Sequence, residues 1–470
     1  MTGSGGSKGE IVSPIDGEVA YTFDRLGMDQ ALSRLSTAMA VQREWRRTPL
    51  QTRIELCRKM LDAYRERLQE NAEQITRMMG KPVAHARGEF TGGTSERTRH
   101  LCDIAEQALA DEVLPEKPGF RRYIRHEPVG VVLDIAAWNY PLLIAVNVIV
   151  PSVLAGNAVL IKHASQTALV ADQFVRAFAD AGAPEGLVQT FPVDHDTAAK
   201  VIATRRIGYV SFTGSVRGGH EIARSVAQDN FINVGLELGG KDPALVLPDA
   251  NFDFTVENLV DGAYFNAGQS CCGIERIYVH RDIYDRFLEA FAAKVREYKV
   301  GNPLEDGTNL GPVVDAKSAA HIKKQVAAAI AAGARSLVPA SAFQVPDLSP
   351  CYLAPAVLDR VDHSMDLMME ETFGPAVGIM KIDDVEQAVS LMNDSPYGLT
   401  ASIWTTDVDR GEAIARDVEA GTVYLNRCDY LDPALAWTGV KDSGVGCSLS
   451  RFGFLQVTRP KSYHLRTEIK

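Results

Sequence analysis

Two adjacent cysteines, Cys271 and Cys272, lie in the segment YFNAGQSCCGIER, residues 264–276. A cysteine acts as a nucleophile only as its thiolate, which needs a polar and partly accessible setting. The spacing of apolar residues predicts a helix over residues 253–267, and Cys271 follows just past Gly268. Free cysteines are also commonly small buried hydrophobes. Taken alone, the segment therefore leaves a nucleophile and a core residue equally open.

The segment GLELGGK, residues 235–241, has the spacing GxxxxGK of a phosphate-binding loop. That loop continues with Ser or Thr, which holds Mg²⁺, whereas Asp242 follows here. Glu237 would also face phosphate groups of its own charge sign. A nucleoside triphosphatase is therefore disfavoured. No metal site is predicted, because adjacent cysteines cannot readily ligate one tetrahedral ion and the spacings HExxH and CxxC are missing.

The elements that must position these segments alternate between strands and helices. Residues 28–111 have the three-to-four spacing of helices. From residue 129 onward, apolar strands alternate with helices, which predicts parallel strands in a doubly wound α/β layer. A second series of this kind starts at residue 242. Two segments alternate with period two and are predicted to be strands, residues 120–130 and 459–467.

Composition excludes several classes of protein. The 470 residues include 49 Lys plus Arg and 60 Asp plus Glu, for a formal net charge of −11. Hydrophobic residues make up 46%, more than a disordered chain would contain. The acidic balance disfavours nucleic-acid binding. Seven cysteines do not make a disulfide framework at this length, so free thiols in a reducing, cytoplasmic compartment are expected.

One stretch imitates a membrane span, since residues 135–161 carry no charge. Pro141, Pro151 and three asparagines make it a poor membrane-spanning helix. We expect a buried strand–turn–helix–strand passage there and no membrane association. The N-terminal segment MTGSGGSKGE has no apolar stretch and is not a secretory signal.

The segments FNAGQSC, which contains Cys271, and ELGGK, which contains Glu237, resemble the aldehyde dehydrogenase superfamily. Further matching segments are AAWNYPL (136–142), FTGS (212–215), EETFGP (370–375), PYGLTA (396–401) and GVKDSGVG (439–446). Their order and spacing are more specific than any one of them, and the resemblance covers nearly the whole chain.

The resemblance implies an α/β fold of the aldehyde dehydrogenase type with three units. These are a Rossmann-type cofactor domain, an α/β catalytic domain and a small β oligomerisation element. Their expected limits are residues 1–114 and 129–239, residues 240–445, and residues 115–128 and 446–470, respectively.

The resemblance also implies oxidation of an aldehyde to a carboxylic acid with hydride transfer to NAD(P)⁺. Cys271 matches the nucleophile, Glu237 the general base that activates water, and Asn139 the amide that stabilises the oxyanion of a thiohemiacetal. Such a donor contributes about 3–4 kcal/mol. Glu237 argues against acylating relatives, which pass the thioester to coenzyme A or phosphate. The three residues together argue against a non-catalytic structural or binding relative.

By the same resemblance, the cofactor contacts Trp138, Lys162, Ser165, Gly214, Ser215, Glu371 and Phe373. Gly214 and Ser215 precede a predicted helix, whose N-terminus favours a phosphate group. Many NAD-preferring members carry Glu at the position of Ser165, where it would repel a 2′-phosphate. We therefore expect NADP⁺ or dual use. The alternative is that Ser165 only caps the following helix.

Tyr140, Phe265 and Trp437 match positions that line the aldehyde tunnel of relatives, and their rings favour an apolar or aromatic substrate. Arg427 keeps a carboxylate-bearing aldehyde open as a weaker alternative, whereas Arg276 matches a structural arginine. In relatives, strands like those expected near 120–127 and 457–467 join a neighbouring subunit's sheet, so a homodimer or homotetramer is expected.

Overall fold

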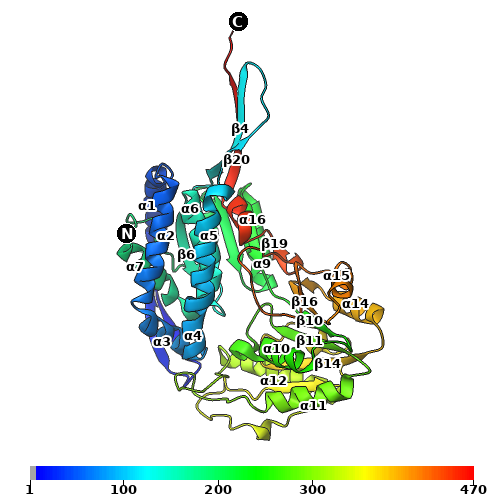
Figure 1. The fold of residues 1–470 in the computed structure, drawn as a ribbon. Helices are drawn as coiled ribbons and strands as arrows, with labels where there is room; N and C mark the ends of the chain where they lie inside the picture. The colour runs from blue at the N-terminus through cyan, green and yellow to red at the C-terminus, as the bar shows by residue number, and fades with distance from the viewer. Residues whose placement is uncertain (1–6, 470) are drawn as a thin grey trace.

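The structure, a computed structural model, describes residues 7–469 and consists of two lobes and a projecting arm (Figure 1). A six-stranded sheet forms the centre of the N-terminal lobe, in the order β19-β9-β8-β5-β6-β7. All neighbouring strands are parallel except β19 and β9. The strands are β5 (Val131–Ala136), β6 (Ala158–His163), β7 (Val188–Thr190), β8 (Tyr209–Thr213), β9 (Asn233–Glu237) and β19 (Gly444–Val445).

Helices connect these strands and cover both faces of the sheet, as the predicted alternation requires. The crossover helices are α6 (Pro141–Ala155), α7 (Leu169–Asp180), α8 (His195–Ala203) and α9 (Val216–Asp229). The preceding helices are α1 (Met28–Trp45), α2 (Leu50–Arg65), α3 (Leu68–Met79), α4 (Val83–Glu89) and α5 (Ser95–Ala108), with a π-helical turn at Phe90–Thr94. A hairpin of β1 (Lys8–Val12) and β2 (Val19–Asp24) precedes them.

The uncharged passage is buried inside this lobe, as predicted. It forms the end of β5, the helix α6 and most of β6, and nearly every residue of α6 is buried. The indole Nε1 of Trp45 donates to the carbonyl of Val153 on α6 at 3.0 Å. Within residues 7–469, no helix is both long and apolar enough to cross a membrane.

A seven-stranded sheet forms the second lobe, in the order β12-β13-β14-β11-β10-β16-β17. Its strands are β10 (Asp242–Val246), β11 (Ile274–His280), β12 (Arg335–Ser336), β13 (Ala356–Asp359), β14 (Ala376–Ile382), β16 (Thr400–Trp404) and β17 (Thr422–Leu425). Its helices are α10 (Phe252–Tyr264), α11 (Tyr284–Val295), α12 (Ala316–Ala331), α13 (Asp366–Met369), α14 (Val385–Asn393) and α15 (Val408–Ala415). A short pair, β15 (Tyr397–Gly398) and β18 (Val440–Lys441), lies beside it.

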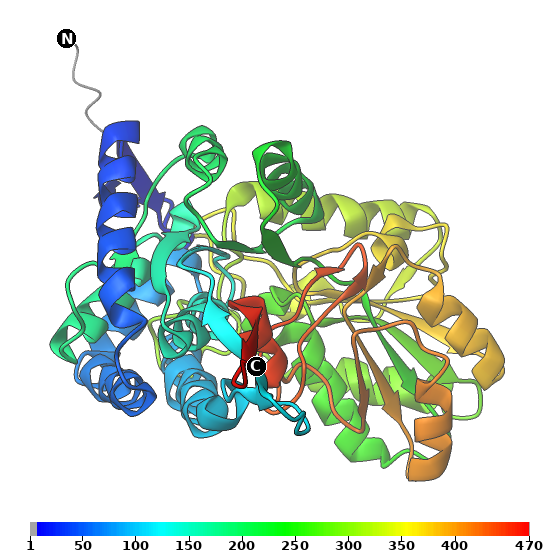
Figure 2. The ribbon, with the colours of Figure 1, turned by 90° about the horizontal axis from the view of Figure 1, so that it is seen from above.

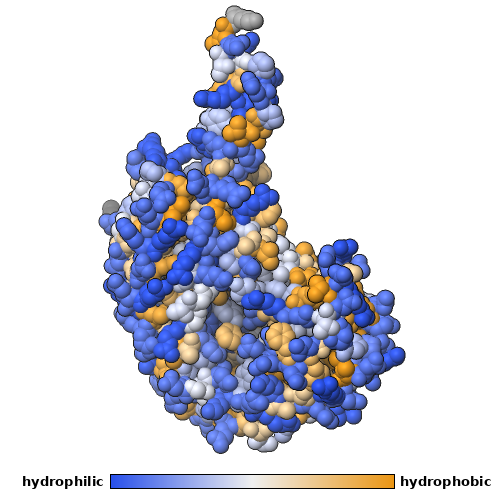
Figure 3. Space-filling view, in the orientation of Figure 1, coloured by the Kyte–Doolittle hydropathy of each residue, from blue (hydrophilic) through white to orange (hydrophobic). Residues whose placement is uncertain are grey.

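The arm consists of β4 (Phe120–Pro128), paired antiparallel along its whole length with β20 (Thr458–Arg466), and of β3 (Glu112–Val113). It extends away from both lobes (Figure 1), and its surface mixes hydrophilic and hydrophobic residues (Figure 3). Helix α16 (Ser450–Gln456) instead packs against α5 and α6. The limits of the three predicted units stay a prediction.

Seen from above, the two lobes lie side by side, and the arm with the C-terminus rises near their junction (Figure 2). The segments that link the lobes carry the motifs: β9 ends the first sheet at Glu237, and β10 begins the second at Asp242. The ELGGK segment therefore lies where the two sheets meet.

Candidate active site

The helix before the two cysteines ends about one turn earlier than the spacing of its apolar residues predicts. Helix α10 ends at Tyr264, so the expected helix to residue 267 is wrong at its C-terminus. Asn266 and Ala267 adopt left-handed backbone angles, with φ of 53° and 57°, which end the helix. A Cβ on the next residue, Gly268 (φ 68°), would lie 2.2 Å from the carbonyl oxygen of Gly374. The chain can turn toward the cysteines here only because this position lacks a side chain.

Cys271 lies at a cavity of about 510 Å³ between the two sheets. The cavity is lined by all three predicted catalytic residues and by five of the seven predicted cofactor residues: Cys271, Glu237, Asn139, Trp138, Gly214, Ser215, Glu371 and Phe373. A cavity of this size takes a ligand larger than an aldehyde group.

The two adjacent cysteines differ in their surroundings. Cys271 is partly exposed and faces the cavity, so it is not a buried core residue. Cys272 is 2% exposed, and its thiol donates to Oδ1 of Asp429 at 3.1 Å. The hydrogen bond with the neighbouring thiol of Cys271, followed by burial, holds the pKa of Cys272 well above its usual range. The core interpretation thus fits Cys272, and Cys271 has the accessibility that a nucleophile needs.

The side-chain amide of Asn139 is held in place by the cysteine loop. Its Nδ2 donates to the backbone carbonyl of Gln269 at 3.2 Å, and the backbone carbonyl of Asn139 accepts from Nδ2 of Asn266 at 3.1 Å. Gln269 in turn accepts, through Oε1, from the backbone N–H of Val314 at 2.7 Å. An amide nitrogen carries two hydrogens, so one N–H of Asn139 stays available to the cavity.

Glu237 stands at the end of β9, with its side chain partly open to the cavity. Burial raises the pKa of Glu237, while the neighbouring Ser448, Arg97 and Trp437 oppose that rise. A carboxylate whose pKa is raised toward neutrality is a stronger base than a free one.

Gly239 and Gly240 of the ELGGK segment allow three segments of the chain to approach one another closely at the cavity. A Cβ on Gly239 would lie 2.5 Å from the carboxylate of Glu371, and one on Gly240 would lie 2.4 Å from the carbonyl oxygen of Cys271. The N–H of Gly240 donates to Glu371 at 3.0 Å. Burial raises the pKa of Glu371 to about 8.

Lys241 is buried, at 1% exposed, and does not face solvent. Its ammonium forms a buried ion pair with Glu275 and donates to the Thr372 hydroxyl at 3.0 Å. Glu275 also accepts from the backbone N–H groups of Thr372 and Phe373, at 2.8 and 2.9 Å. The pair therefore fixes the loop that carries Glu371 and Phe373. Sequence reasoning missed Glu275, although an acidic residue in a buried strand signals a buried partner.

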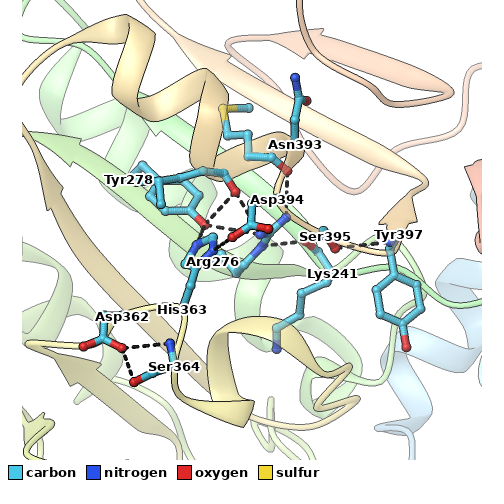
Figure 4. Close-up of polar contacts among 12 residues, drawn as sticks. Lys241, Arg276, Tyr278, Asp362, His363, Ser364, Asn393, Asp394, Ser395 and Tyr397 are labelled. Carbon is cyan, nitrogen blue, oxygen red and sulfur yellow. Dashed lines mark hydrogen bonds and ion pairs between the residues drawn. The ribbon is translucent and has the colours of Figure 1, made fainter.

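Arg276 has the structural role expected of it (Figure 4). Its Nε donates to the carbonyl of Lys241 at 2.8 Å, and its Nη2 donates to the carbonyl of Met392 at 3.1 Å. Beside it, the Tyr278 hydroxyl contacts Nε2 of His363 at 2.8 Å. This network joins β11 to the residue before β10 and to the end of α14.

The N-terminus of α9 is built to receive an anion. Ser215 is the N-cap, and its hydroxyl accepts from the N–H of Gly218 at 3.2 Å. Both Gly214 and Ser215 line the cavity, so the positive end of the helix dipole is open to it. The rings of Trp138 and Phe373, which also line the cavity, pack edge to face with their centroids 5.5 Å apart. These features fit a pyrophosphate and a flat ring, as a dinucleotide would supply.

Lys162 and Ser165 are not brought into this cavity. Lys162 is the penultimate residue of β6 and is 6% exposed. Ser165 lines a second cavity of about 290 Å³, together with Arg25 and Arg34. The alternative that Ser165 caps the next helix is wrong, because Ala168 is the N-cap of α7.

The three predicted tunnel residues pack against other side chains and do not line the large cavity. The ring of Tyr140 lies 4.2 Å from the ammonium of Lys81, and Phe265 stacks on His85 at 4.4 Å. Trp437 is 4% exposed and packs in a cluster with Cys272, next to Cys271. None of the three lines the large cavity.

Asp429 was missed by sequence reasoning. Besides the thiol of Cys272, it accepts from the Ser270 hydroxyl at 2.8 Å. Burial raises the pKa of Asp429 to about 6. It lies near Tyr140, whose pKa it raises in addition to burial. Its place in an irregular segment gave no periodic signal.

As for metals, residues 7–469 hold no group of three or more His, Cys, Asp or Glu side chains that could bind an ion.

Comparisons with known proteins agree with one another. A sequence profile of the aldehyde dehydrogenase family matches residues 1–463. The chain is 36% identical to the NAD(P)⁺ succinate semialdehyde dehydrogenase Sad of Escherichia coli (strain K12), over 94% of each chain.

Solved structures are similar along the whole chain. The succinic semialdehyde dehydrogenase of Streptococcus pyogenes, in complex with NADP⁺, superposes with a TM-score of 0.92 at 28% identity, covering 97% of this chain and 100% of that one. A double mutant of betaine aldehyde dehydrogenase from Staphylococcus aureus, in complex with NAD⁺, also gives 0.92 at 28% identity, covering 99% and 94%.

Proposed function

Because the chain belongs to the aldehyde dehydrogenase family, we propose that Cys271, Glu237 and Asn139 carry out its reaction. That reaction is the oxidation of an aldehyde to a carboxylic acid with NAD(P)⁺. The observation that supports the assignment is the single cavity that these three side chains share with five residues suited to a dinucleotide.

In the first step, the thiolate of Cys271 attacks the carbonyl carbon and forms a tetrahedral thiohemiacetal. The free N–H of Asn139 and the backbone N–H of Cys271 stabilise its oxyanion, each by about 3–4 kcal/mol. When bound, NAD(P)⁺ accepts the hydride that leaves this carbon, and a thioester on Cys271 results. Glu237 then takes a proton from a water molecule, whose oxygen attacks the thioester. The acid is released and the thiol is restored.

For the substrate, we propose an apolar or aromatic aldehyde, supported by the match of Tyr140, Phe265 and Trp437 to tunnel positions of the family and by the packing of Trp437 next to Cys271. A semialdehyde with a carboxylate is the second candidate, favoured by the name of the Escherichia coli relative. Arg427, which would meet that carboxylate, has its guanidinium 3.5 Å above the ring of Tyr430. A panel of aliphatic and aromatic aldehydes and a semialdehyde, followed at 340 nm, should give the highest kcat/KM with an aromatic member. A clear preference for the semialdehyde would contradict the first candidate.

For the cofactor, we propose that NADP⁺ is accepted at least as well as NAD⁺, because Ser165 places no negative charge near a 2′-phosphate. Replacing Ser165 by Glu should lower kcat/KM for NADP⁺ by on the order of 10²-fold and leave NAD⁺ in use, since like charges brought together cost several kcal/mol. Ser165→Gln is the control for size. Fluorescence titration with each cofactor should show the same selectivity, and equal NADP⁺ affinity in Ser165→Glu and wild type would refute the proposal.

For the assembly, we propose a homodimer or homotetramer joined through the strands β4 and β20. The arm supports this, because it extends from the lobes with little of its own core. Sedimentation velocity on the full chain tests it, and a monomer at micromolar concentration would contradict it.

All seven cysteines are free, which supports a reducing, cytoplasmic compartment.

A further inference from the structure

Glu237 lies between two spaces. One is the large cavity that contains Cys271. The other is a small cavity of about 20 Å³ on the far side of β9, lined by Glu237, Asn147 and Ser448 among others. A space of about 10–15 Å³ holds one water molecule. The carboxylate can therefore be solvated on the side away from the nucleophile as well as on the reacting side.

Arg97, on α5, is a buried cation beside this small cavity. It is 5% exposed, and its Nη1 donates to the carbonyl of Leu143 and to Oδ1 of Asn147, both at 3.1 Å. Within the described chain, its Nε has no hydrogen-bond partner. Burying a cation is costly unless an anion compensates it. Burial lowers the pKa of Arg97, and Glu237 is the strongest of the charges that oppose this effect.

In the large cavity, Glu237 shares the lining with the titratable or charged groups Cys271, Asp315, Lys317, His321 and Glu371. The groups below lie on the side of the small cavity. Asp134, on the same face of the sheet, is 1% exposed, and burial followed by the charge of Glu237 holds its pKa well above the usual range. Burial also raises the pKa of Cys447, to about 11, and that of Tyr209. The remaining polar neighbours on this side are uncharged: Asn147 on α6, Ser211 on β8, Gln456 on α16, and Ser448 and Trp437 in the segment before α16. On this side, Arg97 is the buried cation.

We propose that Arg97, held by Asn147 beside the small cavity that Glu237 also lines, is a positioning residue that keeps the Glu237 carboxylate ionised for its reaction with water. The proposal rests on the assignment of Glu237 as the general base. It gives Arg97 no contact with the substrate. Its effect is confined to the step in which water attacks the acyl-enzyme.

The test is the pH dependence of acyl-enzyme hydrolysis, measured as the steady-state rate after the burst of NAD(P)H. A neighbouring guanidinium lowers the pKa of a carboxyl group by roughly 1–3 units. Because the base must be ionised, Arg97→Met should move the acid limb of the profile upward by about 1–3 pH units. The rate should recover at high pH. Arg97→Lys keeps the charge and should keep the limb close to that of wild type.

Two further variants complete the design. Arg53→Met is the matched control, since Arg53 donates to the carbonyl of Leu154 on the same helix α6 at 2.7 Å without facing Glu237. It should leave the pH profile in place. Arg97→Gln keeps a donor for Leu143 without the charge, and it replaces Arg97→Met where that variant does not fold.

An unchanged acid limb in both neutral variants overturns the proposal. So does a rise in the KM of the aldehyde with an unchanged limb, which would make Arg97 a substrate-binding residue. The base assignment is tested separately: Glu237→Gln should accumulate acyl-enzyme at every pH. If it does so while the Arg97 variants keep the wild-type profile, only the proposal for Arg97 fails.

Discussion

Replacing Cys271 by Ala should abolish NAD(P)H production, lowering kcat by on the order of 10⁴-fold or more. Without the thiolate, no covalent intermediate forms. The groups that would stabilise its oxyanion then have nothing to stabilise. Cofactor binding should persist, because Trp138, Ser215 and Glu371 contact the cavity independently of Cys271. Steady-state kinetics at 340 nm and fluorescence titration with the cofactor measure the two effects.

Cys272→Ala is the matched control, because the chain places a second thiol next to the first. That thiol is 2% exposed and donates to Asp429. Its loss should lower thermal stability slightly, by about 1 kcal/mol for a small buried group, and leave turnover of the same order as wild type. Surviving oxidation in Cys271→Ala, or its loss only in Cys272→Ala, would show that the nucleophile is misassigned.

The variant Glu237→Gln should separate the two halves of the reaction. Gln has the shape of Glu but cannot accept a proton, so the thioester forms and water is not activated. Stopped-flow absorbance should show a burst of one NAD(P)H per site, followed by a steady state slowed by about 10²–10⁴-fold, the usual contribution of a general base.

Glu221→Gln is a suitable control for the loss of charge, since Glu221 is an exposed residue of α9 paired with Arg224. It should keep the wild-type steady state. Unchanged turnover in Glu237→Gln would contradict the assignment of the base. A missing burst in a folded variant that still binds cofactor would show that Glu237 acts before the thioester forms.

The raised pKa of Glu237 gives the reaction a pH dependence with a definite sign. The base acts only when ionised, so hydrolysis of the acyl-enzyme should fall as pH drops below the pKa that burial has raised. The same shift affects folding. The group binds its proton more tightly in the folded state, so its contribution to stability is present at low pH and is lost as pH rises through the folded pKa.

The motifs were sufficient to predict the fold class and the residues gathered at the cavity. The prediction succeeded because short segments form the cavity. For example, Gly239 and Gly240 allow Glu371 and Cys271 to approach closely, and glycines can be read directly from the sequence. Strand–helix alternation likewise predicted the parallel sheets, since connections between parallel strands need helices.

Other features depend on contacts between distant segments, which no local pattern reveals. Arg97 and Asn147 lie on different helices, and only their packing brings a buried guanidinium to Asn147, which lines the small cavity together with Glu237. The end of α10 was misplaced because Ala267 is a good helix former, while the turn there is imposed by the close approach of Gly268 to Gly374. Ser165 matched a capping pattern, but the chain delays the helix until Leu169.

The most direct test of the site is peptide mapping by mass spectrometry of Glu237→Gln, quenched after a single turnover with an aldehyde and NAD(P)⁺. The account predicts the acyl group on Cys271, with Cys272 in the same peptide unmodified when fragmentation separates the two. NAD(P)H formed without an adduct, or an adduct on Cys272, would contradict it.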